Sequence, residues 1–302
     1  MTPVFFALFS AAALAAETPA PSASEVYAQR VSLAAADDSC ALFSAAERAL
    51  LNALAARSRD DAARAGDAPA DLDRFEARFD ATPDACDTPQ LEGAARRHRD
   101  HAEALAGTHE IAFPGVHQDW ISERRDRGAP LWRVRQTDRA RAAMLGIHAG
   151  DDGDLMALAL RSETPPAFAV MVLRDPSRQP EPVDFSASGL LSTPFDDPLS
   201  AWGGASGAQR RITASGRLDA DAAMALAPAG GSSAYAFSFP ETAILALRAL
   251  APRDGVRVEL VGPRGEVLDR LWFEVGMFNA ALAVQALPLP EPEPATALTA
   301  AR

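Results

Sequence analysis

The chain has 302 residues, 48% hydrophobic and 23% charged, so it can bury a core and does not have the composition of a disordered protein. Its 41 acidic residues against 29 basic ones give a formal net charge of -12, which disfavours nucleic acid and anionic membranes as partners. All the basic residues are arginines, which excludes enzymes that need a lysine, such as P-loop nucleotide hydrolases and pyridoxal phosphate enzymes.

Residues 1–16 have the order of a secretory signal peptide. An apolar run from Val4 to Phe9 is followed by small residues up to Ala16, and signal peptidase requires small residues before its cleavage point. The apolar run is shorter than the roughly 20 residues that span a membrane. We expect cleavage after Ala15 or Ala16, a low-complexity linker over residues 17–24, and a periplasmic or secreted protein without a transmembrane segment.

Residues 25–107 are predicted to form a small helical domain. Ser44 and Glu47 have the spacing of a capping box and are followed by leucines on one helical face. Thr88 before Pro89 is typical of another helix start, and Gly107 of its end. The alanine-rich segments between these signals indicate four helices in all.

The only two cysteines, Cys40 and Cys86, are 46 positions apart. This spacing differs from that of a C-x-x-C redox or metal motif, and in an exported chain it favours a disulfide. The alternative is a pair of free, buried thiols. The predicted disulfide would join the entry of the second helix to the connection before the fourth.

Residues 108–287 are predicted to form an antiparallel β domain, because the hydrophobic period changes from about 3.6 to 2 after Gly107. Gly262 to Gly265 separate two apolar runs and predict a β-hairpin. Residues 241–250 fit a helix or a strand, and we favour a short helix. The fold class is therefore α+β: a disulfide-stapled N-terminal helical bundle, then an antiparallel β-sandwich-like domain, then a disordered Pro/Glu/Ala tail over residues 288–302.

Four of the five histidines lie within 20 positions and could bind a metal ion; they are His98, His101, His109 and His117. A metal-dependent hydrolase is accordingly one functional hypothesis. The alternative is that His98 packs inside the helical domain, because it falls in the apolar stripe of its predicted helix. The arginines that flank His98 also oppose a cation, and the H-E-x-x-H signature is absent.

Two surfaces could bind a ligand. Trp202 lies among glycines, where an exposed ring could stack on a sugar; the alternative is that it closes one end of the β domain, the commoner fate of a lone loop tryptophan. Arg124, Arg125 and Arg127 belong to an arginine-rich stretch that could dock an acidic glycan or protein, or simply pair with the many carboxylates of the chain.

No catalytic residue or cofactor follows from these patterns. The interpretation that we favour is an exported, non-catalytic binding or assembly protein of the bacterial envelope. Its expected partner is another envelope protein or an acidic glycan, and not nucleic acid. The alternatives are the metal-dependent hydrolase and a glycan-binding module using Trp202.

Overall fold

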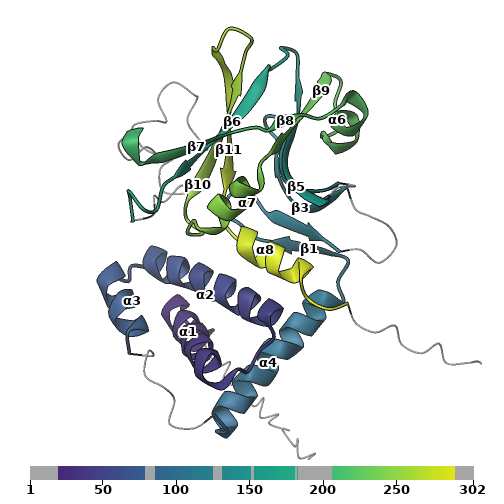
Figure 1. The fold of residues 1–302 in the computed structure, drawn as a ribbon. Helices are drawn as coiled ribbons and strands as arrows, with labels where there is room; N and C mark the ends of the chain where they lie inside the picture. Colours follow the sequence, from purple (N-terminus) through teal and green to yellow (C-terminus); the bar gives the residue numbers. More distant parts are fainter. Residues whose placement is uncertain are drawn as a thin grey trace, which may run out of the picture.

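The structure is a computed structural model that describes residues 20–78, 86–124, 131–150, 153–180, 182 and 206–289. These residues form seven α-helices and two antiparallel sheets, which confirms the α+β class. The helices of the first third of the chain lie on one side of the sheets (Figure 1). They are α1 (Ala23–Cys40), α2 (Ala45–Ala65), α3 (Pro69–Glu76) and α4 (Pro89–Ala106). The expected signal peptide and nearly all of the expected tail lie outside the described residues.

Capping boxes begin the first two helices. Ser44 and Glu47 cap each other's backbone at the start of α2, as the sequence predicted. Ser22 and Glu25 form a second capping box, which starts α1 at Ala23, inside the segment that was expected to be a linker. The predicted Thr88 cap is also present, because its hydroxyl accepts a hydrogen bond from the Leu91 N–H at 3.4 Å.

A seven-stranded sheet has the strand order β1-β2-β3-β4-β5-β9-β8, and every neighbouring pair is antiparallel. Its strands are β1 (Glu110–Phe113), β2 (Trp120–Glu123), β3 (Trp132–Asp138), β4 (Ala143–Gly150), β5 (Gly153–Ser162), β8 (Gly216–Arg217) and β9 (Ser233–Phe239).

A second sheet has four strands in the order β11-β10-β6-β7. They are β6 (Phe168–Arg174), β7 (Gln209–Thr213), β10 (Gly255–Val261) and β11 (Val267–Glu274). β10 and β11 form the predicted hairpin, and Gly265 in its turn has a φ of 85°, which favours glycine. Three further helices accompany the sheets: α6 (Ala220–Leu226), α7 (Glu241–Arg248) and α8 (Phe278–Gln285). The short helix favoured for residues 241–250 is confirmed as α7.

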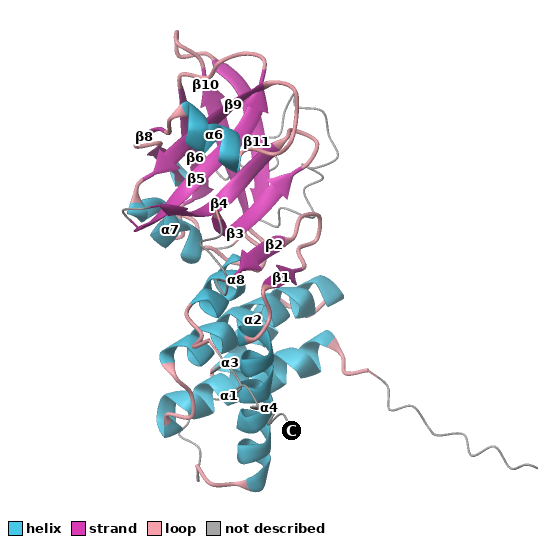
Figure 2. Ribbon diagram, turned by 90° about the vertical axis from the view of Figure 1, so that its right-hand side faces the viewer, coloured by secondary structure: helices cyan, strands magenta, loops and turns pink. Residues whose placement is uncertain are grey.

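One hydrophobic core joins the two sheets and the helices. It combines side chains of both sheets with α7 and α8, and it extends to Leu50 and Ala53 of α2 and to Ala102 and Ala106 of α4. The packing is therefore continuous where the sequence indicates a boundary between a helical and a β domain. Figure 2 shows α8 between the strands and α2.

Helix α8 lies within residues 108–287, where we expected strands and one short helix at residues 241–250, so α8 is an element that the sequence analysis did not predict. Five of its eight residues are buried, namely Phe278, Ala280, Ala281, Ala283 and Val284. A helix that is apolar on most of its circumference shows no amphipathic period, because it is covered on several sides. Its position between α2 and the sheet explains why periodicity did not reveal it.

Candidate functional site

An open groove of about 850 Å³ lies between α1, α2 and α4. α1 packs along α2. One face of α4 is buried along its length: Ala95 packs in a small cluster with Leu33 and Leu51, His98 is buried, and Ala102 and Ala106 belong to the main core. The groove lies beside this buried face, and several of the side chains that line it are short.

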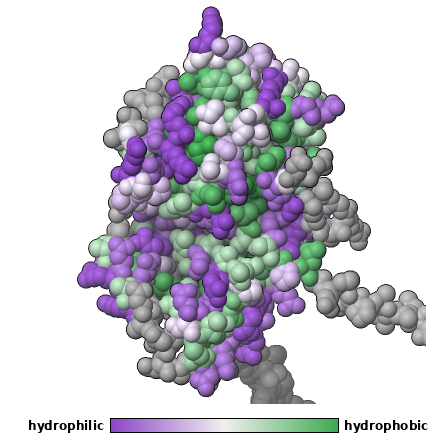
Figure 3. Space-filling model, in the orientation of Figure 1, coloured by the Kyte–Doolittle hydropathy of each residue, from purple (hydrophilic) through white to green (hydrophobic). Residues whose placement is uncertain are grey.

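Alanines account for much of this space. Ala28 and Ala36 of α1 and Ala94 of α4 line the groove, and a methyl group cannot reach across to the opposite helix. Leu51 and Leu54 of α2 also line it. In the orientation of Figure 1, weakly hydrophobic surface (pale green) lies among hydrophilic side chains over the helices (Figure 3). The remaining lining residues are Gln29, Arg30, Ser32, Leu33, Phe75, Thr88, Gln90, Leu91, Arg97, His98 and His101.

The ionisable side chains that line the groove are all basic. Arg30 comes from α1, and Arg97, His98 and His101 come from α4, while no Asp or Glu is among the described lining residues. The whole chain carries a net charge of -12, so this composition is the reverse of its average. The groove therefore combines apolar contact area with positive charge.

Arg30 is half-buried where α1 meets α2. Its Nη1 donates hydrogen bonds to the Leu54 carbonyl at 3.0 Å and to the Ser58 hydroxyl. Burial lowers the pKa of the guanidinium from its ordinary value, and the charge of Asp61 partly opposes this effect. Even so, an arginine stays protonated at neutral pH, so Arg30 contributes a fixed positive charge to the groove.

The two histidines of α4 have different environments. His98 is buried; its Nε2 lies 2.9 Å from the Glu47 carbonyl, and its ring meets Phe43 edge-on with centroids 4.8 Å apart. Because a carbonyl only accepts, Nε2 of His98 carries the proton. His101 is exposed, and partial desolvation, together with the positive charge of His98 and Arg30, lowers its pKa below 6.5. The permanent cations of the groove are its two arginines.

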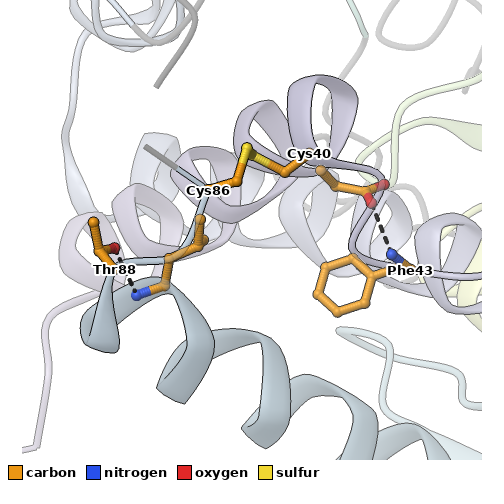
Figure 4. The surroundings of a disulfide bond; sticks show 6 residues. Cys40, Phe43, Cys86 and Thr88 are labelled. Atoms are coloured by element: carbon orange, nitrogen blue, oxygen red, sulfur yellow. Dashed lines mark hydrogen bonds between the residues drawn. A yellow bond between two sulfur atoms is a disulfide. The ribbon is translucent and has the colours of Figure 1, made fainter. Parts of the chain in front are cut away.

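The predicted disulfide between Cys40 and Cys86 is confirmed. It joins the last residue of α1 to the segment just before α4, and Thr88 caps α4 two residues later (Figure 4). The Asp37 carboxylate accepts a hydrogen bond from the Phe43 N–H at 2.9 Å at the same end of α1. This covalent link fixes the start of α4 relative to α1, the two helices that form the walls of the groove.

The four clustered histidines are not brought together. His98 and His101 line the groove, whereas His117 lies in a separate polar depression between β1, β2 and β3, and its backbone N–H donates to Glu274 at 2.6 Å. His109 is exposed just before β1. Nowhere in the described part of the chain do three His, Cys, Asp or Glu side chains lie close enough together to hold a metal ion. The hydrolase hypothesis therefore finds no metal site among these residues.

Arg124 differs from its expected role as an exposed docking residue. It is buried, and its guanidinium donates to the carbonyls of Val284 and Leu287, the latter at 2.6 Å. Val284 lies in the last turn of α8 and Leu287 lies two residues beyond it, so Arg124 joins the end of β2 to the end of this helix. Arg125, Arg127 and Trp202 lie outside the described residues.

Sequence reasoning did not identify Arg30 and Arg97 as site residues. A usable signal was present: Ala28, Ser32 and Ala36 repeat at intervals of four on α1, so a stripe of small residues runs beside Arg30. The same stripe is also compatible with close helix packing. Only the position of α4 shows that the space beside it is open.

No helix in the part of the chain that the structure describes is long and apolar enough to cross a membrane. No protein-family model, curated protein or solved structure matches the chain.

Proposed function

We propose that this chain is an exported, non-catalytic binding protein, and that the groove between α1, α2 and α4 is its binding site for a partner that joins an apolar surface to negative charge. In this proposal the sandwich-like β domain and α8 form the base on which the helical bundle is held.

The observation that carries the proposal is the lining of the groove. Leucines and alanines supply apolar area, and Arg30 and Arg97 face the same space from opposite walls. Sites of this kind bind through apolar burial, and a few charged groups set the specificity. Positive charge in one groove of an acidic protein also attracts anionic partners against the field of the remaining surface.

This lining favours a protein partner over the acidic glycan that the sequence also allowed. A glycan would meet the two arginines, but it would leave Leu51, Leu54 and Leu91 facing polar hydroxyl groups. An apolar, negatively charged segment of another envelope protein matches both features of the groove.

The disulfide supports export. Disulfides form and persist in oxidising compartments, and the order of residues 1–16 is that of a leader which would direct the chain there. Protein recovered from the periplasm or culture medium should begin at Ala16 or Glu17 and should lack two hydrogens relative to the reduced chain. Intact Met1 together with alkylatable thiols would contradict export.

The binding site can be tested with anilinonaphthalene sulfonate, a fluorescent probe that combines an apolar ring system with an anion. The disulfide-bonded mature protein should bind it with a saturable rise in fluorescence. Ala94→Trp places a large ring in the groove and should weaken binding roughly tenfold or more.

Ala104→Trp is the matched control, because Ala104 lies on the same helix but is exposed and does not line the groove. This variant should bind the probe like the wild type. Circular dichroism and thermal melting would show that both variants are folded. Equal binding by wild type and a folded Ala94→Trp variant would refute the proposed site.

A further inference from the structure

The walls of the groove are two helical faces. α1 contributes residues 28, 29, 32, 33 and 36, and α4 contributes residues 90, 91, 94, 97, 98 and 101. These spacings of three and four are those of a single helix face. At 1.5 Å per residue the wall formed by α4 is about 16 Å long, which is the length of an α-helix of about three turns.

The middle of these walls is shaped for close approach. Ala28, Ser32 and Ala36 form a row of small side chains on α1, and Ala94 faces the groove from α4. Packed helices approach to axis distances of about 8–10 Å, and small residues allow the shorter values. The described lining of the groove comes mainly from three helices, so a helix lying in it would contact α1, α2 and α4 together, whereas a narrow ligand would contact fewer of them.

The charges of the groove lie toward one end. Arg97 and His101 are on the second half of α4, and Arg30 is close enough to His101 to affect its pKa. The other end, near the disulfide, carries the neutral groups of Thr88 and Gln90. An occupant should therefore place its negative groups at the arginine end and neutral groups at the disulfide end.

We propose that the groove receives an amphipathic α-helix of a partner protein, with an apolar stripe against α1, α2 and α4 and with acidic side chains against Arg30 and Arg97. This inference rests on the proposed function and specifies its partner. Laying an amphipathic helix into an apolar groove is a recurrent mode of peptide recognition.

The test uses the disulfide-bonded mature protein and two designed peptides. Each peptide has about 18 residues, long enough to form a helix in solution, with a stripe of leucine and alanine. One peptide carries glutamates beside the stripe and the other carries lysines at the same positions. Binding is measured by fluorescence anisotropy and by displacement of anilinonaphthalene sulfonate, with palmitate as a third competitor.

The glutamate peptide should bind, and the lysine peptide should bind roughly tenfold or more weakly. Arg97→Glu should reverse this order. Arg96→Glu makes the same charge change one position away on α4, at an exposed residue that does not line the groove, and should leave the order as in the wild type. A preference that responds equally to both variants would be a general effect of net charge and would overturn the proposal.

Three outcomes separate the two proposals. Failure of the probe to bind in the groove would remove the proposed function itself. Displacement of the probe by palmitate but not by the glutamate peptide would leave a binding groove and overturn the helix as its occupant. Dimerisation that Ala94→Trp abolishes would show that a second copy of this chain, rather than another protein, occupies the groove.

Discussion

Asp37 connects α1, the turn after it and α2 through one buried carboxylate. It lies near the end of α1, accepts a hydrogen bond from the Phe43 N–H at 2.9 Å, and pairs with the Arg48 guanidinium of α2. Burial alone would raise its pKa, but the hydrogen bonds from Arg48 and Phe43 outweigh burial and hold the pKa below its ordinary value of 3.8. The folded state therefore stabilises the charged form.

Asp37→Asn should lower the free energy of unfolding at pH 7 by about 1–3 kcal/mol. Both carboxylate oxygens accept hydrogen bonds, from the Phe43 N–H and the Arg48 guanidinium, whereas the asparagine amide has only one accepting oxygen. Since the folded pKa lies below the unfolded one, the charge-dependent stabilisation is complete above pH 3.8 and is lost as the pH falls through the folded pKa. Urea unfolding should be measured at pH 7 and at several pH values below 3.8. The difference in unfolding free energy between wild type and Asp37→Asn should shrink as the pH falls.

Asp38 offers the matched control for this experiment, because it is the next residue along α1 and is exposed. Asp38→Asn should change stability by less than about 0.5 kcal/mol. If Asp37→Asn and Asp38→Asn were equally stable at pH 7, the hydrogen bonds of the Asp37 carboxylate would not stabilise the folded state.

Arg124 shows at the same scale why an arginine-rich stretch is ambiguous in a sequence. Its neighbours in the chain are charged, which is typical of an exposed segment, yet it is buried against the end of α8, 160 positions away from Val284. Nothing local distinguishes an arginine that caps a distant helix from one that faces water.

At the scale of elements, α4 depends on its two ends. The disulfide fixes its start, and Ala102 and Ala106 join its end to the main core. Between these ends Ala95 and His98 are buried, while the groove lies along the side of the helix that carries Gln90, Ala94 and Arg97. Removing the covalent link should therefore release the first half of α4 more than any other helix.

The double variant Cys40→Ser, Cys86→Ser should lose about 4 kcal/mol of stability, the chain-entropy value for a bridge across 46 positions. Amide hydrogen exchange should show a larger loss of protection at the start of α4 than in α2. Wild-type protein treated with dithiothreitol should behave like the variant. Equal loss of protection in both helices would mean that the disulfide stabilises the whole fold rather than this element.

At the scale of the whole molecule, the helices and sheets share one core through α8. Leu50 and Ala53 of α2 belong to the same cluster as residues of both sheets. Asp60 of α2 also accepts a hydrogen bond from the Arg253 N–H at 2.8 Å, next to β10. Two parts joined in this way should unfold together.

This expectation can be measured with two probes. Helical circular dichroism reports mainly on α1 to α4, whereas the fluorescence of Trp120, Trp132 and Trp272, all buried in β strands, reports on the sheets. Their urea transitions should coincide. Leu50→Ala should shift both midpoints downward together, with a loss of about 2–5 kcal/mol. Separate midpoints would instead show that the helices and the sheets are independent folding units.

The sequence by itself determined the features that depend on neighbouring residues. The Ser44 capping box, the Thr88 cap and the β10–β11 hairpin are complete within a few positions, so their signals are visible in the chain. The Cys40–Cys86 pairing was also determined, because two cysteines in an oxidised chain allow one intramolecular bridge. These local signals were sufficient for the α+β class.

Only the tertiary structure decided the features that depend on distant packing. The groove exists because one face of α4 is buried while short side chains of α1 and α4 leave space beside that face. Its basic character comes from Arg30 and Arg97, which are 67 positions apart in the sequence. α8 is a helix without an amphipathic period because it is covered on several sides. Which side chains meet across such distances is set by how the elements pack, and that packing leaves no periodic trace in any one segment.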